Sequence, residues 1–318
     1  MKDKILGILK ESKSYVSGQE LADRLGVSRT AVWKAVTALK KEGYGIASVS
    51  RLGYKLEDTG DILNERELSF SDKFCFEDEL SSTNEYAKRF AAEGKEEFFF
   101  VTCNRQTAGR GRLGRTWISP YGVNIYLSMI FYPDTDIPDI PQMTPVIGLA
   151  AAKTISDITG LEAKIKWPND ILINDKKISG ILTEMQAEAE RILFVVAGIG
   201  INVNQTEFDK EIAKKASSMR NETGRVFKRS EVIKLLVQNM ETYYKKFIEG
   251  GFSPLRAEYK RLCINLDRDV RAFYRGGEIR GTAVDISEKG ELVIKTENGL
   301  VSISGGEATV RNAGNEYI

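Results

Sequence analysis

Hydrophobic positions follow three different patterns along the 318 residues of the chain. Over residues 1–42, apolar side chains recur at helical spacing. Between about residues 66 and 265, strand-like runs such as Phe98–Val101 alternate with helix-like runs such as Val232–Ile248, which favours a mixed or largely antiparallel sheet. After residue 266 only short strand-like runs remain, and they predict a small SH3-like β-barrel. We therefore expect a multidomain α+β protein with domains at residues 1–60, 66–265 and 267–318, and a polar linker at about 58–65.

The first region predicts a winged helix-turn-helix. Gly26 interrupts the second helix, Ser28 can cap a third helix that runs to about Glu42, and a hairpin with its turn near Leu52 and Gly53 follows. The third helix would enter the major groove of DNA. The expected DNA-facing residues are Ser28, Arg29, Thr30, Trp33, Lys34 and Thr37 on this helix and Arg51 and Lys55 on the wing. A helical bundle that serves only protein contacts is the alternative.

Charge supports DNA binding at this end of the chain. Up to Lys55 there are eleven Lys and Arg against five Asp and Glu, a balance of +6, whereas the whole chain carries 46 against 45 and a net charge of +1. The positive potential is therefore concentrated in the first domain.

Composition excludes several kinds of chemistry. The chain has no histidine, so histidine triads, ligands and bases are excluded. Its three cysteines are widely spaced and form no CxxC pair, which argues against a zinc site or a disulfide framework and fits a cytoplasmic protein. We expect no resident metal site, no signal peptide and no membrane segment, because no apolar run approaches the roughly 20 residues of a spanning helix.

Two segments carry the most specific chemistry. Gly109–Arg115 holds three glycines and three arginines, a composition suited to closing around an anion, although a flexible basic loop is the alternative. In the second segment, Lys166 and Asp170 are followed by Lys177, which predicts a charged site on one hairpin. A simple turn at 167–170 is the alternative there.

Three smaller features add candidate ligand contacts. Gly198, Gly200, Asn202 and Asn204 alternate on one face of a long strand, and the glycines predict a ligand floor, with a bend as the alternative. Ser82 and Glu85 have the spacing of a capping box at a helix start, where a hydroxyl can also bind a polar ligand. Gln106 precedes the arginine-rich loop and is a candidate hydrogen-bonding residue.

The order of these motifs resembles one family. GRGRLGRTW at 109–117, KWPND at 166–170, Lys177 with Gly180, and GIGINVN at 198–204 resemble the biotin–protein ligases. With a winged helix before them, the chain is similar over nearly its full length to the bifunctional type that also represses the biotin operon.

The resemblance implies a two-step reaction and a set of site residues. Biotin and Mg-ATP give biotinyl-5′-AMP, and the acyl group then passes to a lysine of the biotin carboxyl carrier subunit of acetyl-CoA carboxylase. The expected residues are Arg110, Arg112, Lys166, Asp170 and Lys177 for catalysis; Ser82, Thr83, Asn84, Gln106, Arg110, Gly111, Arg112, Lys177, Gly180, Gly198 and Gly200 for biotin; and Trp117, Asn169, Lys177, Asn202 and Arg311 for the nucleotide.

Physical chemistry agrees with these roles. The carboxylate of biotin and the α-phosphate of ATP repel each other, and Arg110, Arg112, Lys177 and Mg²⁺ can neutralise the developing charge. Asp170 is the candidate to orient the acceptor lysine or accept its proton.

The resemblance also implies a ligand-linked homodimer on a palindromic operator. Two alternatives remain, a biotin-sensing repressor without turnover and a lipoate–protein ligase, and the sequence leaves open whether residues 205–229 form a lid.

Overall fold

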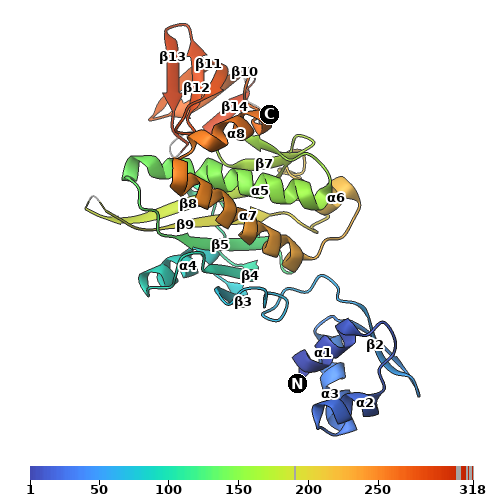
Figure 1. The fold of residues 1–318 in the computed structure, drawn as a ribbon. Coiled ribbons are helices and arrows are strands. Elements are labelled where there is room, and N and C mark those ends of the chain that lie inside the picture. Colours follow the sequence, from blue (N-terminus) through green and yellow to red (C-terminus); the bar gives the residue numbers. More distant parts are fainter. Residues whose placement is uncertain (190, 306–308, 313, 315–316, 318) are drawn as a thin grey trace. The chain divides into compact units, whose positions relative to one another are not determined.

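The computed structural model describes all residues except 190, 306–308, 313, 315–316 and 318. It divides into two compact units, residues 1–69 and 70–318, which are described separately (Figure 1).

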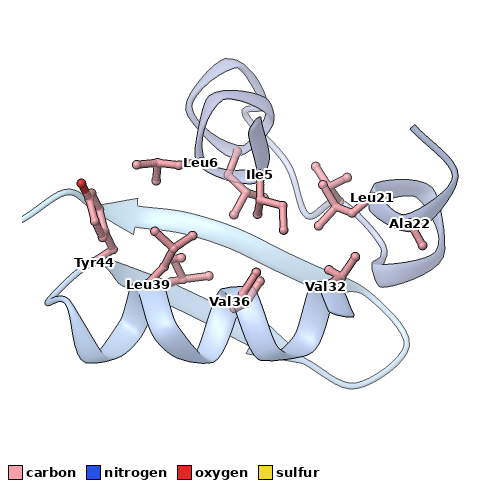
Figure 2. Packing of buried hydrophobic residues seen from close by; sticks show 12 residues of the cluster. Ile5, Leu6, Leu21, Ala22, Val32, Val36, Leu39 and Tyr44 are labelled. Atoms are coloured by element: carbon pink, nitrogen blue, oxygen red, sulfur yellow. The ribbon is translucent and has the colours of Figure 1, made fainter. Parts of the chain in front are cut away.

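The first unit is a helix-turn-helix followed by a hairpin. Its elements are α1 (Lys2–Glu11), α2 (Gly18–Leu25), α3 (Arg29–Lys41), β1 (Gly45–Val49) and β2 (Gly53–Asp58), with β1 and β2 antiparallel. The predicted caps are confirmed, because Gly26 is left-handed at the end of α2 and Ser28 Oγ accepts a hydrogen bond from Ala31 N at the start of α3. Figure 2 shows Ile5, Leu21 and Val36 meeting in its apolar core.

The end of this unit is more ordered than the polar linker that the sequence predicted. Ile62 packs against the core, and the Arg66 guanidinium donates to Asp3 and, at 3.0 Å, to Glu42 Oε2. Lys10 Nζ also lies 3.1 Å from Glu67 Oε1. Apolar packing of Ile62 and the charged contacts of Arg66 and Glu67 therefore tie this segment to the first domain.

The second unit is built around a mixed seven-stranded sheet in the order β3-β4-β5-β9-β8-β7-β6. Only the β3–β4 pair is parallel. The strands are β3 (Phe74–Leu80), β4 (Phe100–Gln106), β5 (Ile125–Phe131), β6 (Lys164–Lys166), β7 (Asp170–Ile173), β8 (Lys176–Glu188) and β9 (Arg191–Ile201). The mixed sheet confirms the sequence prediction for this region.

Helices cover both faces of this sheet. The helix α4 (Thr83–Ala92) packs on the face that bears Tyr126 and Ile130. The long helices α5 (Met143–Thr159) and α7 (Arg229–Gly250) pack against each other, and Gly148 of α5 lies near the side chains of Ile165 and Ile181. Because successive strand residues point to opposite faces, Lys166 and Gly180 belong to the face away from α5. The unit also contains the short α-helices α6 (Met219–Thr223) and α8 (Arg256–Leu262).

A smaller antiparallel sheet ends the chain, as the sequence predicted. Its order is β13-β12-β11-β10-β14, formed by β10 (Arg268–Tyr274), β11 (Gly277–Ile286), β12 (Leu292–Thr296), β13 (Gly299–Ile303) and β14 (Thr309–Asn312). Trp167 joins this sheet to the central one: its side chain is fully buried, and its Nε1 donates to Gly290 O at 3.0 Å. Lys166 Nζ also donates to Val310 O, which holds β14 beside the KWPND segment. No helix within the described part of the chain is long and apolar enough to cross a membrane.

Candidate functional site

One row of paired residues crosses five strands and forms the floor of a cavity. Tyr126 on β5 pairs with Gly200 on β9, Gly200 with Gly180 on β8, Gly180 with Asp170 on β7, and Asp170 with Lys166 on β6. Paired residues share a face of the sheet, and all five line the same cavity. The glycine floor and the charged group, which are far apart in the sequence, are thus one continuous surface.

Hydroxyl and amide groups form one wall of the cavity. Thr83 and Asn84 are buried at the start of α4, and Ser128 Oγ donates to Thr83 Oγ1 at 2.7 Å. Gln106 Oε1 accepts hydrogen bonds from the backbone N–H and the hydroxyl of Thr83. Asn84 Nδ2 donates to Glu184 Oε2 at 2.6 Å. Because these groups hold one another, their polar atoms are fixed before any ligand arrives.

The capping box predicted from Ser82 and Glu85 is wrong. Ser82 is the N-cap residue of α4, but its side chain makes no cap hydrogen bond. Glu85 accepts instead from Arg110 Nη1 at 2.8 Å and from Lys88 Nζ at 3.3 Å. The Arg110 guanidinium, which belongs to the arginine-rich loop, outcompetes the local backbone as the partner of Glu85. This leaves the Ser82 hydroxyl uncommitted to capping at the cavity edge.

A compact charged cluster lies at the other end of the floor. Lys177 Nζ lies 2.6 Å from Asp170 Oδ1, and Tyr317 donates its hydroxyl to Asp170 Oδ2 at 2.7 Å. Lys166 Nζ donates to Val310 O at 3.1 Å and lies 4.4 Å from the centre of the Tyr317 ring. The strand β14 therefore closes this end of the cavity.

Burial and charge set the protonation of this cluster. Burial opposes ionisation of Asp170, but the positive charges of Lys177 and Lys166 prevail and hold its pKa below the ordinary value. Burial lowers the pKa of Lys166 to about 8, with Asp170 opposing the shift. Burial and the Asp170 charge both raise the pKa of Tyr317, so that its phenol stays protonated. Asp170 is therefore an anion among cations and a weak base.

The arginine-rich loop lies over this floor. Arg112 donates to Asn169 Oδ1 at 3.0 Å and to Gly305 O, and burial lowers its pKa. Leu113 is left-handed, with a φ of 55°, and 64% exposed. Trp117 packs its indole on the glycine floor, and its Nε1 is buried with no hydrogen-bond acceptor among the residues that the structure describes. The loop thus presents cations and an unsatisfied donor to the cavity.

The structure brings most of the predicted site together. Lining residues that the sequence predicted are Ser82, Thr83, Asn84, Gln106, Arg110, Gly111, Arg112, Trp117, Lys166, Asn169, Asp170, Lys177, Gly180, Gly198, Gly200 and Arg311. Asn202 does not line the cavity, because its Nδ2 donates to Ser217 O and its backbone N–H to Ile178 O. Residues 215–217, within the segment considered as a lid, pair with the backbone of Lys177.

Sequence reasoning missed three contributors to the site. Tyr126 lies on the buried strand β5, and no sequence motif marks it as part of the site. Glu184 accepts a hydrogen bond from the Asn84 side chain, which is 100 residues away in the sequence. Tyr317 lies outside every motif, and nothing in the sequence connects it with Asp170.

A groove on the first unit contains part of the predicted DNA surface. It is lined by residues of α3, the wing and the α2 start, including Arg29, Thr30, Trp33 and Arg51. The Trp33 side chain is 57% exposed although it is large and apolar. Ser28 and Lys34 are exposed outside the groove lining, and Thr37 and Lys55 are half-buried.

Comparison with known proteins agrees with this geometry. Residues 77–202 match the biotin/lipoate A/B protein ligase family, 2–55 an HTH domain, and 266–311 the biotin protein ligase C-terminal domain. The chain is 37% identical over 311 residues to the bifunctional ligase/repressor BirA of Bacillus subtilis, covering 95% of this chain and 96% of that protein. The chain belongs to the family of bifunctional ligase/repressors. Identity to BirA of Escherichia coli is 26%, over 98% of this chain and 97% of that protein.

A solved family member supports the same assignment. The biotin protein ligase from Aquifex aeolicus, in complex with biotin and ATP, is 31% identical, with a TM-score of 0.67, and covers 76% of this chain and 100% of its own. The family assignment confirms the expected fold class and the combination of a ligase with a helix-turn-helix domain. The described residues contain no group of three or more Cys, Asp or Glu side chains able to hold a metal ion.

Proposed function

We propose that this protein is an ATP-dependent biotin–protein ligase that forms biotinyl-5′-AMP, transfers biotin to a carrier lysine and represses biotin genes. One observation carries the proposal: a single cavity joins a buried hydroxyl-and-amide wall to a cluster of cations that surrounds one carboxylate.

The uncharged wall suits the ring system of biotin. A ureido group both donates and accepts hydrogen bonds, and Ser82, Thr83, Asn84 and Gln106 offer both kinds of partner. Gly198 and Gly200 have no side chain to collide with Asn84 and Trp117, so these two groups can lie directly on the strand at the proposed biotin site. Gly111, Gly180, Arg110, Arg112 and Lys177 complete the proposed biotin contacts.

The cationic end suits adenylation. A carboxylate oxygen of biotin attacks the α-phosphorus of ATP, a P–O bond forms, and pyrophosphate leaves. Arg110, Arg112, Lys166 and Lys177 would neutralise the charge that develops, each preorganised donor contributing roughly 3 kcal/mol. Trp117, Asn169 and Arg311 are the proposed nucleotide contacts. Mg²⁺ would arrive as Mg-ATP with the phosphates among its ligands, because the cavity residues that the structure describes include one carboxylate.

Asp170 would serve the transfer step. The acceptor amine attacks the acyl carbon, the bond to the phosphate oxygen breaks, and AMP leaves. Because its neighbours make Asp170 a weak base, we assign it the orientation of the acceptor ammonium rather than its deprotonation.

The winged helix would bind operator DNA, with Trp33 and Arg51 at the groove. A homodimer linked to ligand binding would place two such domains on a palindromic site, with the arginine-rich loop ordering around the adenylate.

The experiment is pyrophosphate release from Mg-ATP by the full chain, with biotin and lipoate added separately. The proposal predicts release with biotin and none with lipoate. Release with lipoate alone would assign a lipoate ligase instead. No release with either would leave a ligand-sensing repressor.

A further inference from the structure

Tyr317 covers the carboxylate of the cavity. Its hydroxyl donates to Asp170 Oδ2 at 2.7 Å, while Lys177 holds the other oxygen at 2.6 Å. Its ring lies beside Lys166, with Nζ 4.4 Å from the ring centre. Oδ2 of Asp170 therefore has a hydrogen-bond donor in Tyr317, whereas buried Oδ1 has the Lys177 ammonium as an ion-pair partner and no hydrogen bond among the described residues.

Asp170 is also the negatively charged side chain among the described lining residues that can attract a positively charged substrate. Among the described lining residues it is the single carboxylate, and the same lining carries Arg110, Arg112, Arg115, Lys166, Lys177 and Arg311. An acceptor lysine is an ammonium in water at neutral pH. The cationic side chains of this lining repel such a group, whereas the Asp170 carboxylate attracts it. Lys177 is needed for adenylation in the proposed function, so Tyr317 is the partner that can withdraw.

We propose that Tyr317 is a gate over the acceptor-lysine subsite, which must leave Asp170 before an amine can bind there. This inference rests on the proposed ligase function and adds a control on its second step. While Tyr317 is in place, Asp170 is masked and water is kept from this end of the cavity. When the tyrosine withdraws, its place at Oδ2 is free for the acceptor ammonium, which then loses a proton to solvent and attacks the acyl carbon, and AMP leaves.

Tyr317 has no role as a base in this scheme. Burial and the neighbouring carboxylate raise its pKa, so the phenol remains a hydrogen-bond donor throughout the working range. A phenol that donates to Asp170 competes directly with an ammonium that must donate to the same oxygen.

The test uses preformed biotinyl-5′-AMP and Nα-acetyl-lysine amide, a small acceptor that needs no protein docking surface. Single-turnover transfer is measured for the wild type, Tyr317→Ala and Tyr317→Phe in the full chain. A hydrogen bond to a charged group has to be broken in the wild type, so Tyr317→Ala should raise the second-order rate constant about tenfold. Tyr317→Phe keeps the ring and should give a smaller rise. Adenylate hydrolysis without acceptor should also be faster in Tyr317→Ala.

Tyr121→Phe is the matched control. The Tyr121 hydroxyl donates to Asp78 Oδ1 at 2.8 Å, nearly the same geometry, but outside the cavity and on a residue that is 56% exposed. Its removal should leave transfer unchanged. Thermal unfolding of each variant checks that the fold is retained, and Tyr317→Phe decides the question if Tyr317→Ala is unstable.

Unchanged or slower transfer in the folded Tyr317 variants would overturn the gate. A decrease in both would identify Tyr317 as a residue that positions Asp170. Failure of the proposed function is distinguishable, because the wild type would then release no pyrophosphate with biotin and would transfer nothing from the adenylate.

Discussion

The indole of Trp117 packs so closely on Gly200 that a Cβ atom at residue 200 would lie 2.3 Å from Cε2 of the ring. The same ring lies 2.9 Å from the Cβ position of Gly180. Glycine at these positions therefore has a steric reason: the floor of the cavity must accept an aromatic ring directly on the backbone.

Gly200→Ala should displace Trp117 and impair the nucleotide half of the site. Overpacking of this kind costs about 1–3 kcal/mol, so kcat/KM for ATP should fall by roughly 5- to 150-fold. Gly148→Ala is the control, because its Cβ would meet only ordinary contacts, the nearest at 3.8 Å. Steady-state pyrophosphate release measures both. Equal activity of the two variants would show that Trp117 is not held by the glycine floor.

Arg112→Ala should lower the rate of adenylation by about 10²–10³, since one preorganised cation at the developing charge is lost. The paired control is Arg105→Ala, which removes a surface guanidinium lying 3.2 Å from Glu79 and should have little effect. Rapid-quench formation of biotinyl-5′-AMP is the measurement. If the two variants form adenylate at the same rate, Arg112 does not act at the α-phosphate.

Adenylation should slow as pH rises through about 8, because the pKa of Lys166 is lowered to about 8 by its burial and the amine loses its charge above that pH. Asp170 opposes this shift, whereas Lys177, Arg311 and Arg115 add to it. Asp170→Asn should therefore move the falling limb to lower pH. The rate of pyrophosphate release between about pH 6.5 and 9.5 measures the position of this limb in the wild type and in Asp170→Asn. A limb at the same pH in both proteins would show that another group is titrating.

Arg51→Ala should weaken DNA binding similarly on all sequences and reduce the salt slope by about one, as expected for a lost phosphate contact. Trp33→Ala should instead relax the sequence preference, because its exposed ring lies on the recognition helix. Lys4→Ala, an exposed lysine outside the groove, is the control. Binding of the full chain to sequences selected from a random DNA pool measures all three. Loss of preference in Arg51→Ala and not in Trp33→Ala would reverse these roles.

Much of this site could be predicted because its chemistry is local. Arg112 stands in a short glycine-rich segment, and Lys166, Asp170 and Lys177 lie on one hairpin, so residue type and spacing identify them. Ser28 was correctly predicted as a helix cap because its hydroxyl accepts a hydrogen bond from a backbone N–H only three residues away.

The remainder depends on contacts that no local pattern encodes. Ser82 lost its predicted capping box because Glu85 pairs with Arg110, 25 residues further along the chain. Asn202 continues an alternating pattern past the end of β9, where the strand no longer faces the cavity and its amide binds Ser217. Tyr317 donates a hydrogen bond to Asp170 across 147 residues, a pairing that only the tertiary structure brings about.

The route of the carboxylate oxygens of biotin tests the two-step reaction most directly. The full chain is given Mg-ATP, an acceptor and biotin labelled with ¹⁸O at both carboxylate oxygens, and the products are analysed by mass spectrometry. An acyl-adenylate intermediate predicts one ¹⁸O in AMP and one in the amide formed on the lysine. AMP without ¹⁸O, formed alongside a biotinylated acceptor, would contradict attack of biotin on the α-phosphorus.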